Sequence, residues 1–172
     1  MLSRRVSLVV AGLVLAGLTG CTPTPAPTPT PTGFASEDEA FAAAKETYRA
    51  YTTAVDAYYG GDREADPLRY LTHDALSAEK EAQAVFEEEG LRSEGTSRVS
   101  SFIAESTTVI SGAAEVQAVA CVDTSDRQIF DSEGNLLNAD ADPLIAQEVT
   151  LVSIDGEMRI SSATQVDAAV SC

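Results

Sequence analysis

The spacing of apolar residues divides the chain into a helical part before residue 95 and a strand part after it. A helix of about six turns is predicted from apolar positions that recur every three or four residues. It begins at the capping box Ser36-Glu37-Asp38-Glu39 and ends at Gly60-Gly61. Asp66-Pro67 and Ser77 each precede a shorter apolar pattern and predict two further helices. The expected buried positions are Phe41, Ala44, Tyr48, Tyr51, Val55 and Tyr58 in the first helix, Leu68 and Leu71 in the second, and Ala78, Ala82, Val85 and Phe86 in the third.

The period changes to two after Gly95, as is typical of strands with one buried face. Residues 98–109 and 115–123 predict two long strands around a turn at Ser111-Gly112, with Val116, Ala118, Ala120 and Val122 on one face. Asp155-Gly156 predicts a two-residue hairpin loop that sets Val152 opposite Arg159 and Leu151 opposite Ile160. Residues 128–130 and 136–137 predict a small hairpin. We therefore expect an α+β fold in which three N-terminal helices precede a curved antiparallel sheet of about four main strands.

The first 20 residues have the pattern of an export signal. Arg4 and Arg5 precede an apolar run, 6–18, that is too short for a bilayer core of about 30 Å, which takes about 20 helical residues. The sequence Leu18-Thr19-Gly20-Cys21 resembles the bacterial lipobox, whose cysteine carries a diacylglyceryl group and becomes the mature N-terminus. We predict that residues 1–20 are a lipoprotein signal peptide and that Cys21 is the lipidation site. The alternative is an ordinary signal peptide cleaved elsewhere, with Cys21 an incidental thiol.

A short tether is predicted between Cys21 and the folded domain. Residues 22–32 alternate Pro with small residues, which favours polyproline II over helix or sheet and allows a length of about 34 Å. We assign 21–33 to the lipidated cysteine and linker and 34–172 to one α+β domain. Export by the general or the twin-arginine route, and glycosylation of the linker, stay open.

The charge of the chain excludes some partners. It has 11 Lys and Arg residues against 27 Asp and Glu residues, and loss of residues 1–20 leaves 9 against 27, a formal charge of −18. Such a surface argues against nucleic-acid binding, which needs basic side chains at the phosphates. It is also repelled by anionic headgroups within about 8 Å. Stalk and charge together are expected to hold the domain away from the membrane to which Cys21 anchors it.

The order of these elements resembles the cone-shaped fold of the nuclear transport factor 2 and ketosteroid isomerase superfamily. The segments 120–125, 131–135 and 151–160, with the terminal Cys172, are similar to those of actinobacterial lipoproteins of unassigned function. The resemblance implies a curved sheet wrapped around the long first helix, with a cavity between them. In enzymes of this fold a Tyr and an Asp inside the cavity polarise a carbonyl and move a proton.

The cysteines suggest one covalent link. With Cys21 lipidated, Cys121 and Cys172 remain as an even pair in an oxidising compartment, which predicts a disulfide that ties the C-terminus to the sheet. The only histidine, His73, is interpreted as an exposed or capping residue, and Asn138, Asp140 and Asp142 as a solvated loop that lacks the full calcium-loop pattern. We predict no catalytic, cofactor-binding or metal-binding residues.

The resemblance makes Tyr48, Tyr51 and Tyr58 the candidate cavity-lining residues, and their helical spacing is also explained by core or half-buried packing. We favour a lipid-anchored extracytoplasmic binding or interaction domain with an unknown small-molecule or protein partner. The alternatives are a small-molecule isomerase, lyase or hydrolase that uses the cavity, and a structural envelope protein with no ligand. An open cavity with a Tyr–carboxylate pair would favour the enzyme, an open apolar cavity a ligand-binding protein, and a filled cone the structural role.

Overall fold

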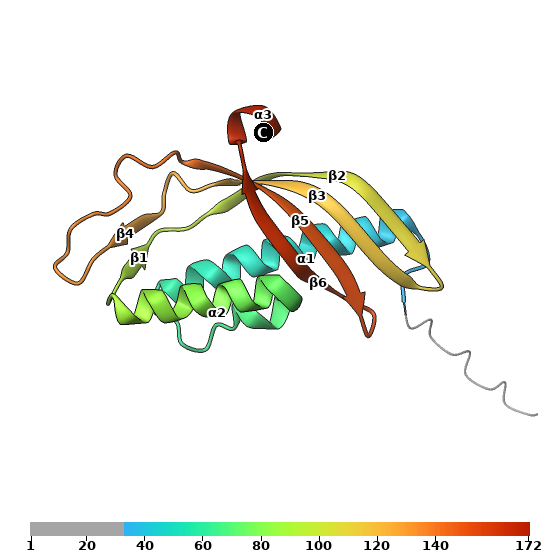
Figure 1. The fold of residues 1–172 in the computed structure, drawn as a ribbon, viewed down its shortest axis with the longest axis horizontal. Coiled ribbons are helices and arrows are strands. Elements are labelled where there is room, and N and C mark those ends of the chain that lie inside the picture. Colours follow the sequence, from blue (N-terminus) through green and yellow to red (C-terminus); the bar gives the residue numbers. More distant parts are fainter. Residues whose placement is uncertain (1–32) are drawn as a thin grey trace, which may run out of the picture.

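Two long helices and two antiparallel sheets make up the described part of the chain, residues 33–172, in this computed structural model (Figure 1). The predicted signal peptide, Cys21 and residues 22–32 lie outside the described residues. The elements are α1 (Glu37–Tyr59), the 3-10 helix η1 (Pro67–Tyr70), α2 (His73–Glu88), β1 (Arg92–Glu94), β2 (Arg98–Ile110), β3 (Ala113–Asp123), β4 (Gln128–Phe130), β5 (Leu144–Ile154), β6 (Glu157–Val166) and α3 (Ala168–Ser171). The predicted α+β class with a curved antiparallel sheet is confirmed.

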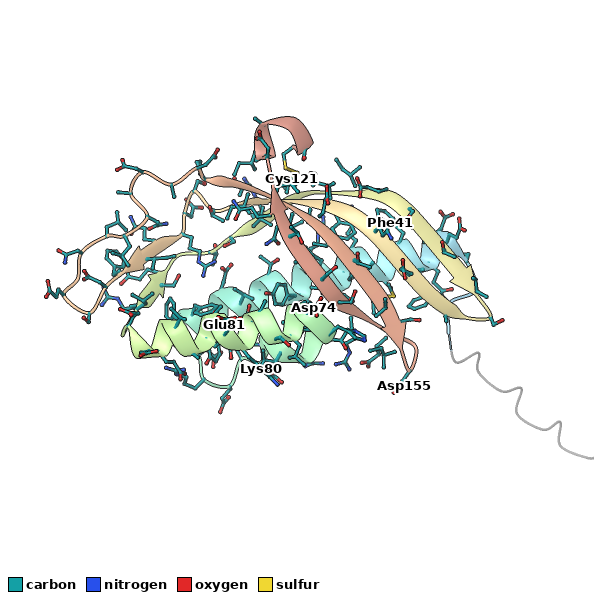
Figure 2. The ribbon with its side chains drawn as sticks, viewed as in Figure 1. Phe41, Asp74, Lys80, Glu81, Cys121 and Asp155 are labelled. Atoms are coloured by element: carbon teal, nitrogen blue, oxygen red, sulfur yellow. A yellow bond between two sulfur atoms is a disulfide. The ribbon has the colours of Figure 1, made fainter. Side chains whose placement is uncertain are left out.

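The main sheet has four antiparallel strands in the order β2-β3-β5-β6, and both long helices lie on the same side of it (Figure 1). At the β5–β6 turn, Asp155 and Gly156 have φ values of 52° and 83°, as a type I′ loop requires. The predicted register is confirmed, because Val152 pairs with Arg159 and Leu151 with Ile160. Figure 2 places Asp155 at the tip of this hairpin, beyond the end of the sheet.

A second, two-stranded sheet was not predicted. β4 was expected to pair within its own hairpin, but it pairs with β1, where Ser93 lies opposite Ile129. The expected return arm at 136–137 is reduced to a single bridge between Phe130 and Leu136. The chain turns between α2 and β1 at Gly90, whose φ is 63°, and β1 then lies beside β4. This small sheet extends the fold beyond one end of the main sheet.

The long first helix begins as the sequence predicts. The Ser36 hydroxyl accepts a hydrogen bond from the Glu39 amide at 3.2 Å, and Glu39 Oε2 accepts one from the Ala35 amide at 2.8 Å. Three acidic residues occupy the first turn, where the helix dipole favours negative charge. At the C-terminal end of α1, the Gly60 amide donates a hydrogen bond to the Asp56 carbonyl.

The other helices differ from the prediction. The predicted helix after Asp66 is one 3-10 turn, because the chain leaves it at Leu71 to form a bridge with Ile160 of β6. The predicted start of the next helix at Ser77 is wrong: α2 begins one turn earlier, at His73, after an extended Thr72. With this start its buried residues are Ala75 and Glu79, and the expected Ala78, Ala82 and Val85 are exposed. The prediction of three helices and four strands is therefore matched only in part.

The hydrophobic core joins the first half of α1 to the main sheet. The period-two face of β3 predicted from the sequence is the one that α1 covers. Small residues on both elements allow the close approach, since Ala40 and Ala44 are fully buried against it. The remaining buried members are Tyr48, Leu71, Ala75, Phe102, Ala114, Val116, Ala118, Ala120, Val122, Val149, Leu151, Met158 and Ile160. All of them lie after residue 33, so a chain that begins at residue 22 keeps this core.

The C-terminus is linked covalently to the main sheet, on the face opposite α1. Cys121 alternates with Ala120 and Val122 along β3, so its side chain points away from α1. It forms the predicted disulfide with Cys172, whose Cα lies 5.9 Å away (Figure 2). The bond seats α3 against β3 and β5. Within residues 33–172, no helix is long and apolar enough to cross a membrane.

Loss of the disulfide should lower the free energy of unfolding. Cys121 and Cys172 are 51 positions apart, and a loop of that length corresponds to about 4 kcal/mol in the loop-entropy estimate. A Cys172→Ala variant should therefore unfold at a lower urea concentration than the oxidised wild-type protein. Reductant should shift the wild-type midpoint and leave that of the variant unchanged. Equal midpoints for variant and oxidised wild type would contradict this account.

Candidate functional site

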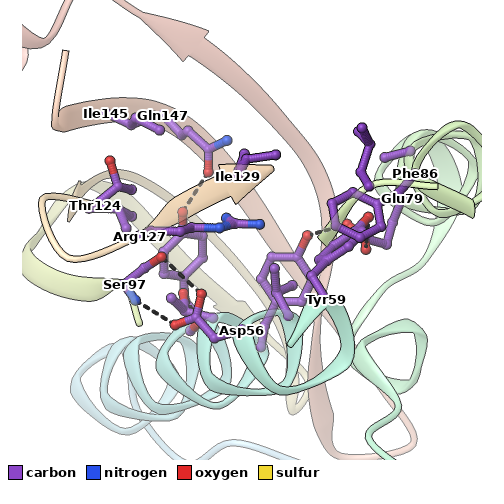
Figure 3. Close-up of a pocket in the computed structure, with 17 residues that line it drawn as sticks. Asp56, Tyr59, Glu79, Phe86, Ser97, Thr124, Arg127, Ile129, Ile145 and Gln147 are labelled. Atoms are coloured by element: carbon purple, nitrogen blue, oxygen red, sulfur yellow. Dashed lines mark hydrogen bonds between the residues drawn. The ribbon is translucent and has the colours of Figure 1, made fainter. Parts of the chain in front are cut away.

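A partly open cavity of about 310 Å³ lies beside the second half of α1, at the end of the molecule where β1 and β4 pair (Figure 3). Its wall combines α1, α2, the loop before β2, the segment from the end of β3 to β4, and the start of β5. The lining residues are Tyr48, Tyr51, Thr52, Val55, Asp56, Tyr59, Glu79, Ala82, Phe86, Leu91, Ser97, Val122, Thr124, Arg127, Ile129, Ile145 and Gln147.

Two tyrosines of α1 share one buried carboxylate of α2. The Tyr51 hydroxyl donates to Glu79 Oε2 at 2.8 Å, and the Tyr59 hydroxyl donates to Glu79 Oε1 at 3.0 Å. The Gln83 amide adds a third donor at 3.2 Å. Burial, and then the Glu79 charge, raise the pKa of Tyr51 and Tyr59 well above the usual value of tyrosine. Both phenols therefore stay protonated and both donate to the same carboxylate.

A second carboxylate in the wall, that of Asp56, accepts both of its hydrogen bonds from Ser97. Asp56 is 8% exposed, and its two oxygens accept from the Ser97 amide at 2.6 Å and the Ser97 hydroxyl at 2.9 Å. These bonds hold the start of β2 against α1, as the dashed lines in Figure 3 show. Asp56 is thus a structural link between two walls of the cavity.

Two further polar side chains of the wall, Tyr48 and Arg127, donate hydrogen bonds. The Tyr48 hydroxyl donates to Gln147 Oε1 at 2.5 Å, and burial raises the pKa of Tyr48 well above its usual value. Arg127 Nε donates to the hydroxyl of buried Ser93 at 3.3 Å. Its guanidinium lies 5.7 Å from the centre of the Tyr59 ring and forms no ion pair with a carboxylate of residues 33–172.

Apolar side chains form the rest of the wall. Phe86 packs edge to face on Tyr59, with ring centres 4.5 Å apart. Val55, Ile129 and Ile145 approach from three different elements. A partly open cavity with apolar walls and a few polar groups is the usual form of a small-molecule site in proteins.

Two of the three predicted cavity residues line this cavity. Tyr48 and Tyr51 do, but Tyr58 is absent from the wall, and its place is taken by Tyr59. A helix has about 3.6 residues per turn, so Tyr59, eleven residues after Tyr48, returns to the same face, whereas Tyr58 does not. The Tyr58 hydroxyl instead donates to Glu87 at 3.1 Å, beside the ion pair of Arg63 with Glu87.

The other residues considered for chemistry have structural positions. His73 is exposed at the start of α2. Asn138 bonds to the backbone of Arg127 and Ile129, at 2.9 Å in each case, and Asp142 accepts from the Leu144 amide. In the described part of the chain, no group of three or more His, Cys, Asp or Glu side chains could hold a metal ion.

Sequence reasoning missed Glu79, Asp56, Arg127 and Gln147. One of them had a visible signal: Glu79 lies four residues after Ala75 and seven before Phe86, so a carboxylate occupies an otherwise apolar helix face. The wrong helix start at Ser77 concealed that spacing. Arg127 and Gln147 had no such signal, because they meet the cavity only through the pairing of strands far apart in the chain.

The Tyr–Glu79 cluster predicts a pH dependence of stability. Below about pH 10, Tyr51 and Tyr59 are protonated in both the folded and the unfolded chain, so their raised pKa values do not change the free energy of unfolding. Above about pH 10, the unfolded chain loses these protons first, and the free energy of unfolding therefore falls. In Glu79→Gln this fall should be smaller, because the charge that opposes tyrosinate is gone. Urea unfolding between about pH 8 and pH 11 measures it. The matched control, Glu88→Gln at the exposed end of α2, should behave as wild type; identical slopes in both variants would contradict the proposed coupling.

Comparison with known proteins supports the fold and no further assignment. No protein-family profile and no curated protein sequence matches the chain. Among solved structures, the crystal structure of the intermembrane space region of chloroplast protein ARC6 is similar, with a TM-score of 0.50 and 15% sequence identity. The match covers 72% of this chain and 93% of the ARC6 chain. At this identity the likeness concerns the arrangement of helices and strands alone.

Proposed function

We propose that the protein is a lipid-anchored extracytoplasmic binding protein whose cavity takes a small molecule with an apolar body. The observation that carries the proposal is the cavity itself, about 310 Å³ in volume and lined by side chains from both helices and from three strands. The wall is rigid on its polar side, because Asp56 and Glu79 are fixed by hydrogen bonds. Preformed walls lower the ordering cost of binding.

The location of the protein in the cell is proposed from its sequence. A basic start, an apolar run and a lipobox occur in order before Cys21, and residues 22–32 follow as a stalk. Cys121 and Cys172 form a disulfide, which is the state expected in an oxidising compartment outside the cytoplasm. The strongly acidic domain would then stand away from an anionic membrane surface. We also retain the cone-shaped fold of the nuclear transport factor 2 and ketosteroid isomerase superfamily as a proposal, supported by a long helix against a curved antiparallel sheet.

An enzyme is the second candidate, favoured by the Tyr51–Glu79–Tyr59 cluster inside an open cavity. A carboxylate can act as a general base and a phenol can polarise a carbonyl. Binding ranks first because both phenol protons are donated to Glu79 and neither is available to a substrate carbonyl in this arrangement. The variant Glu79→Gln separates the two functions, since catalysis needs the base and simple binding does not. A structural role without ligand is disfavoured, because the cavity is not filled.

The anchor can be tested by mass. Wild-type protein recovered from a bacterial host should begin at Cys21 and carry the mass of a diacylglyceryl group. Cys21→Ala should carry no lipid and should not be cleaved at that position, because the thiol is the atom that takes the lipid. Intact mass spectrometry measures both, and Cys172→Ala serves as a control that loses the disulfide and keeps the lipid. A mature wild-type chain with a free Cys21 thiol would contradict the proposed anchor.

Binding can be tested by closing the cavity. The chain from residue 22 onward should increase the fluorescence of the uncharged apolar dye N-phenyl-naphthylamine. Ala82 lines the cavity but is itself exposed, so Ala82→Trp should cover the opening without disturbing the core and weaken dye binding at least about tenfold. Ala78→Trp places the same side chain one turn earlier on α2, at an exposed position outside the wall, and should leave binding unchanged. Equal dye affinity in both variants would show that the dye binds elsewhere.

A further inference from the structure

The cavity offers a ligand more hydrogen-bond donors than acceptors. Its two carboxylates already accept at least two bonds each from protein groups, Asp56 from Ser97 and Glu79 from two phenols and an amide. Two donor groups of the wall have capacity left. Gln147 receives the Tyr48 hydroxyl on its oxygen, and its amide nitrogen has no partner among residues 33–172. Arg127 has five N–H donors, of which the bond to Ser93 uses one.

Arg127 is held in place at both ends. Its amide donates to the Thr124 carbonyl and its carbonyl accepts from the Asn138 side chain, each at 2.9 Å. The guanidinium is fixed by Ser93, which is 3% exposed, and by the face of the Tyr59 ring. Figure 3 shows the side chain reaching into the middle of the site, between Asp56 and Tyr59 on one side and Gln147 on the other. A guanidinium set in this way keeps its outer N–H groups for a ligand.

Three of the seven arginines in residues 33–172, Arg49, Arg69 and Arg127, form no ion pair with a carboxylate, and of these three Arg127 lines the cavity. Four other arginines of the described part, Arg63, Arg92, Arg98 and Arg159, pair with carboxylates on the surface. Arg127 has two carboxylates in the same cavity wall and forms an ion pair with neither. Phenol and backbone donors satisfy those carboxylates instead. Arg127 is therefore left without a carboxylate partner from residues 33–172.

From these contacts we infer that the ligand is an organic carboxylate, bound by Arg127 through its acidic end while its apolar body packs on Val55, Phe86 and Ile129. A planar guanidinium matches a carboxylate with two parallel hydrogen bonds. The amide of Gln147 supplies a further donor from β5. The inference rests on the proposed binding function and specifies the ligand class of the same cavity.

Three probes with one apolar body test the inference: naphthoate, naphthalenemethanol and naphthylmethylamine, which are anionic, neutral and cationic at neutral pH. Titrations at physiological ionic strength use the chain from residue 22 onward, and the methyl signals of Val122 and Ile129 report binding in the cavity. Naphthoate should bind about tenfold more tightly than the alcohol, as expected for hydrogen bonds to a charged group, and the amine more weakly than the alcohol.

Variants then identify the group responsible. Arg127→Gln should abolish the preference, so that naphthoate and the alcohol bind with equal affinity, and its methyl spectrum outside the cavity shows whether the variant is folded. Arg127→Lys keeps the charge without the planar fork and should retain part of the preference, and it replaces the Gln variant if that one does not fold. Arg98→Gln removes the same charge from an arginine that does not line the cavity and should keep the full preference.

The outcomes separate the two proposals. An alcohol that binds as tightly as naphthoate, or a preference that survives in Arg127→Gln, overturns the carboxylate inference and leaves the binding function in place. A cavity that binds the amine best overturns it as well and assigns the ligand to the cations. If none of the three probes shifts the signals of Val122 or Ile129, both the inference and the proposed binding function are wrong.

Discussion

The close packing of the first half of α1 against β3 is the constraint on which the rest of the structure depends. Ala40 and Ala44 are fully buried on the helix, as are Ala118 and Ala120 on the strand, so the two backbones approach with little side-chain volume between them. Tyr48 ends this contact, and the second half of the helix faces the cavity. One helix thus contributes to a tightly packed core at one end and to the wall of a cavity at the other.

The polar groups of the cavity follow from this arrangement. A helix that lines a cavity exposes side chains on a face that would otherwise be core, and here that face carries tyrosines. Each phenol needs a partner, because an unpaired buried hydroxyl is costly. Glu79 supplies it for Tyr51 and Tyr59, and Gln147 for Tyr48. Both carboxylates of the wall are bonded by the protein's own donors, and Arg127 forms no ion pair within residues 33–172, which is the basis of the ligand class that we propose.

The disulfide agrees with the location that the N-terminal pattern predicts. The N-terminal pattern predicts an exported lipoprotein without reference to the fold. The disulfide between β3 and the last residue of the chain lies on the side of the sheet away from α1, so it stabilises the sheet without touching the cavity. The disulfide is the state expected for the extracytoplasmic location that we propose.

The sequence by itself determined the α+β class, the helix cap at Ser36, the register of the β5–β6 hairpin and the cysteine pair. These features depend on neighbours in the chain, on turn chemistry or on the count of a rare residue. Only the tertiary structure decided the start of α2, the pairing of β1 with β4 and the choice of Tyr59 over Tyr58 in the cavity. Arg127 and Gln147 line the same cavity because the segment before β4 and strand β5 both reach its wall. Contacts between segments far apart in the chain produce no periodic pattern in the sequence. The cavity wall could therefore be identified only from the tertiary structure.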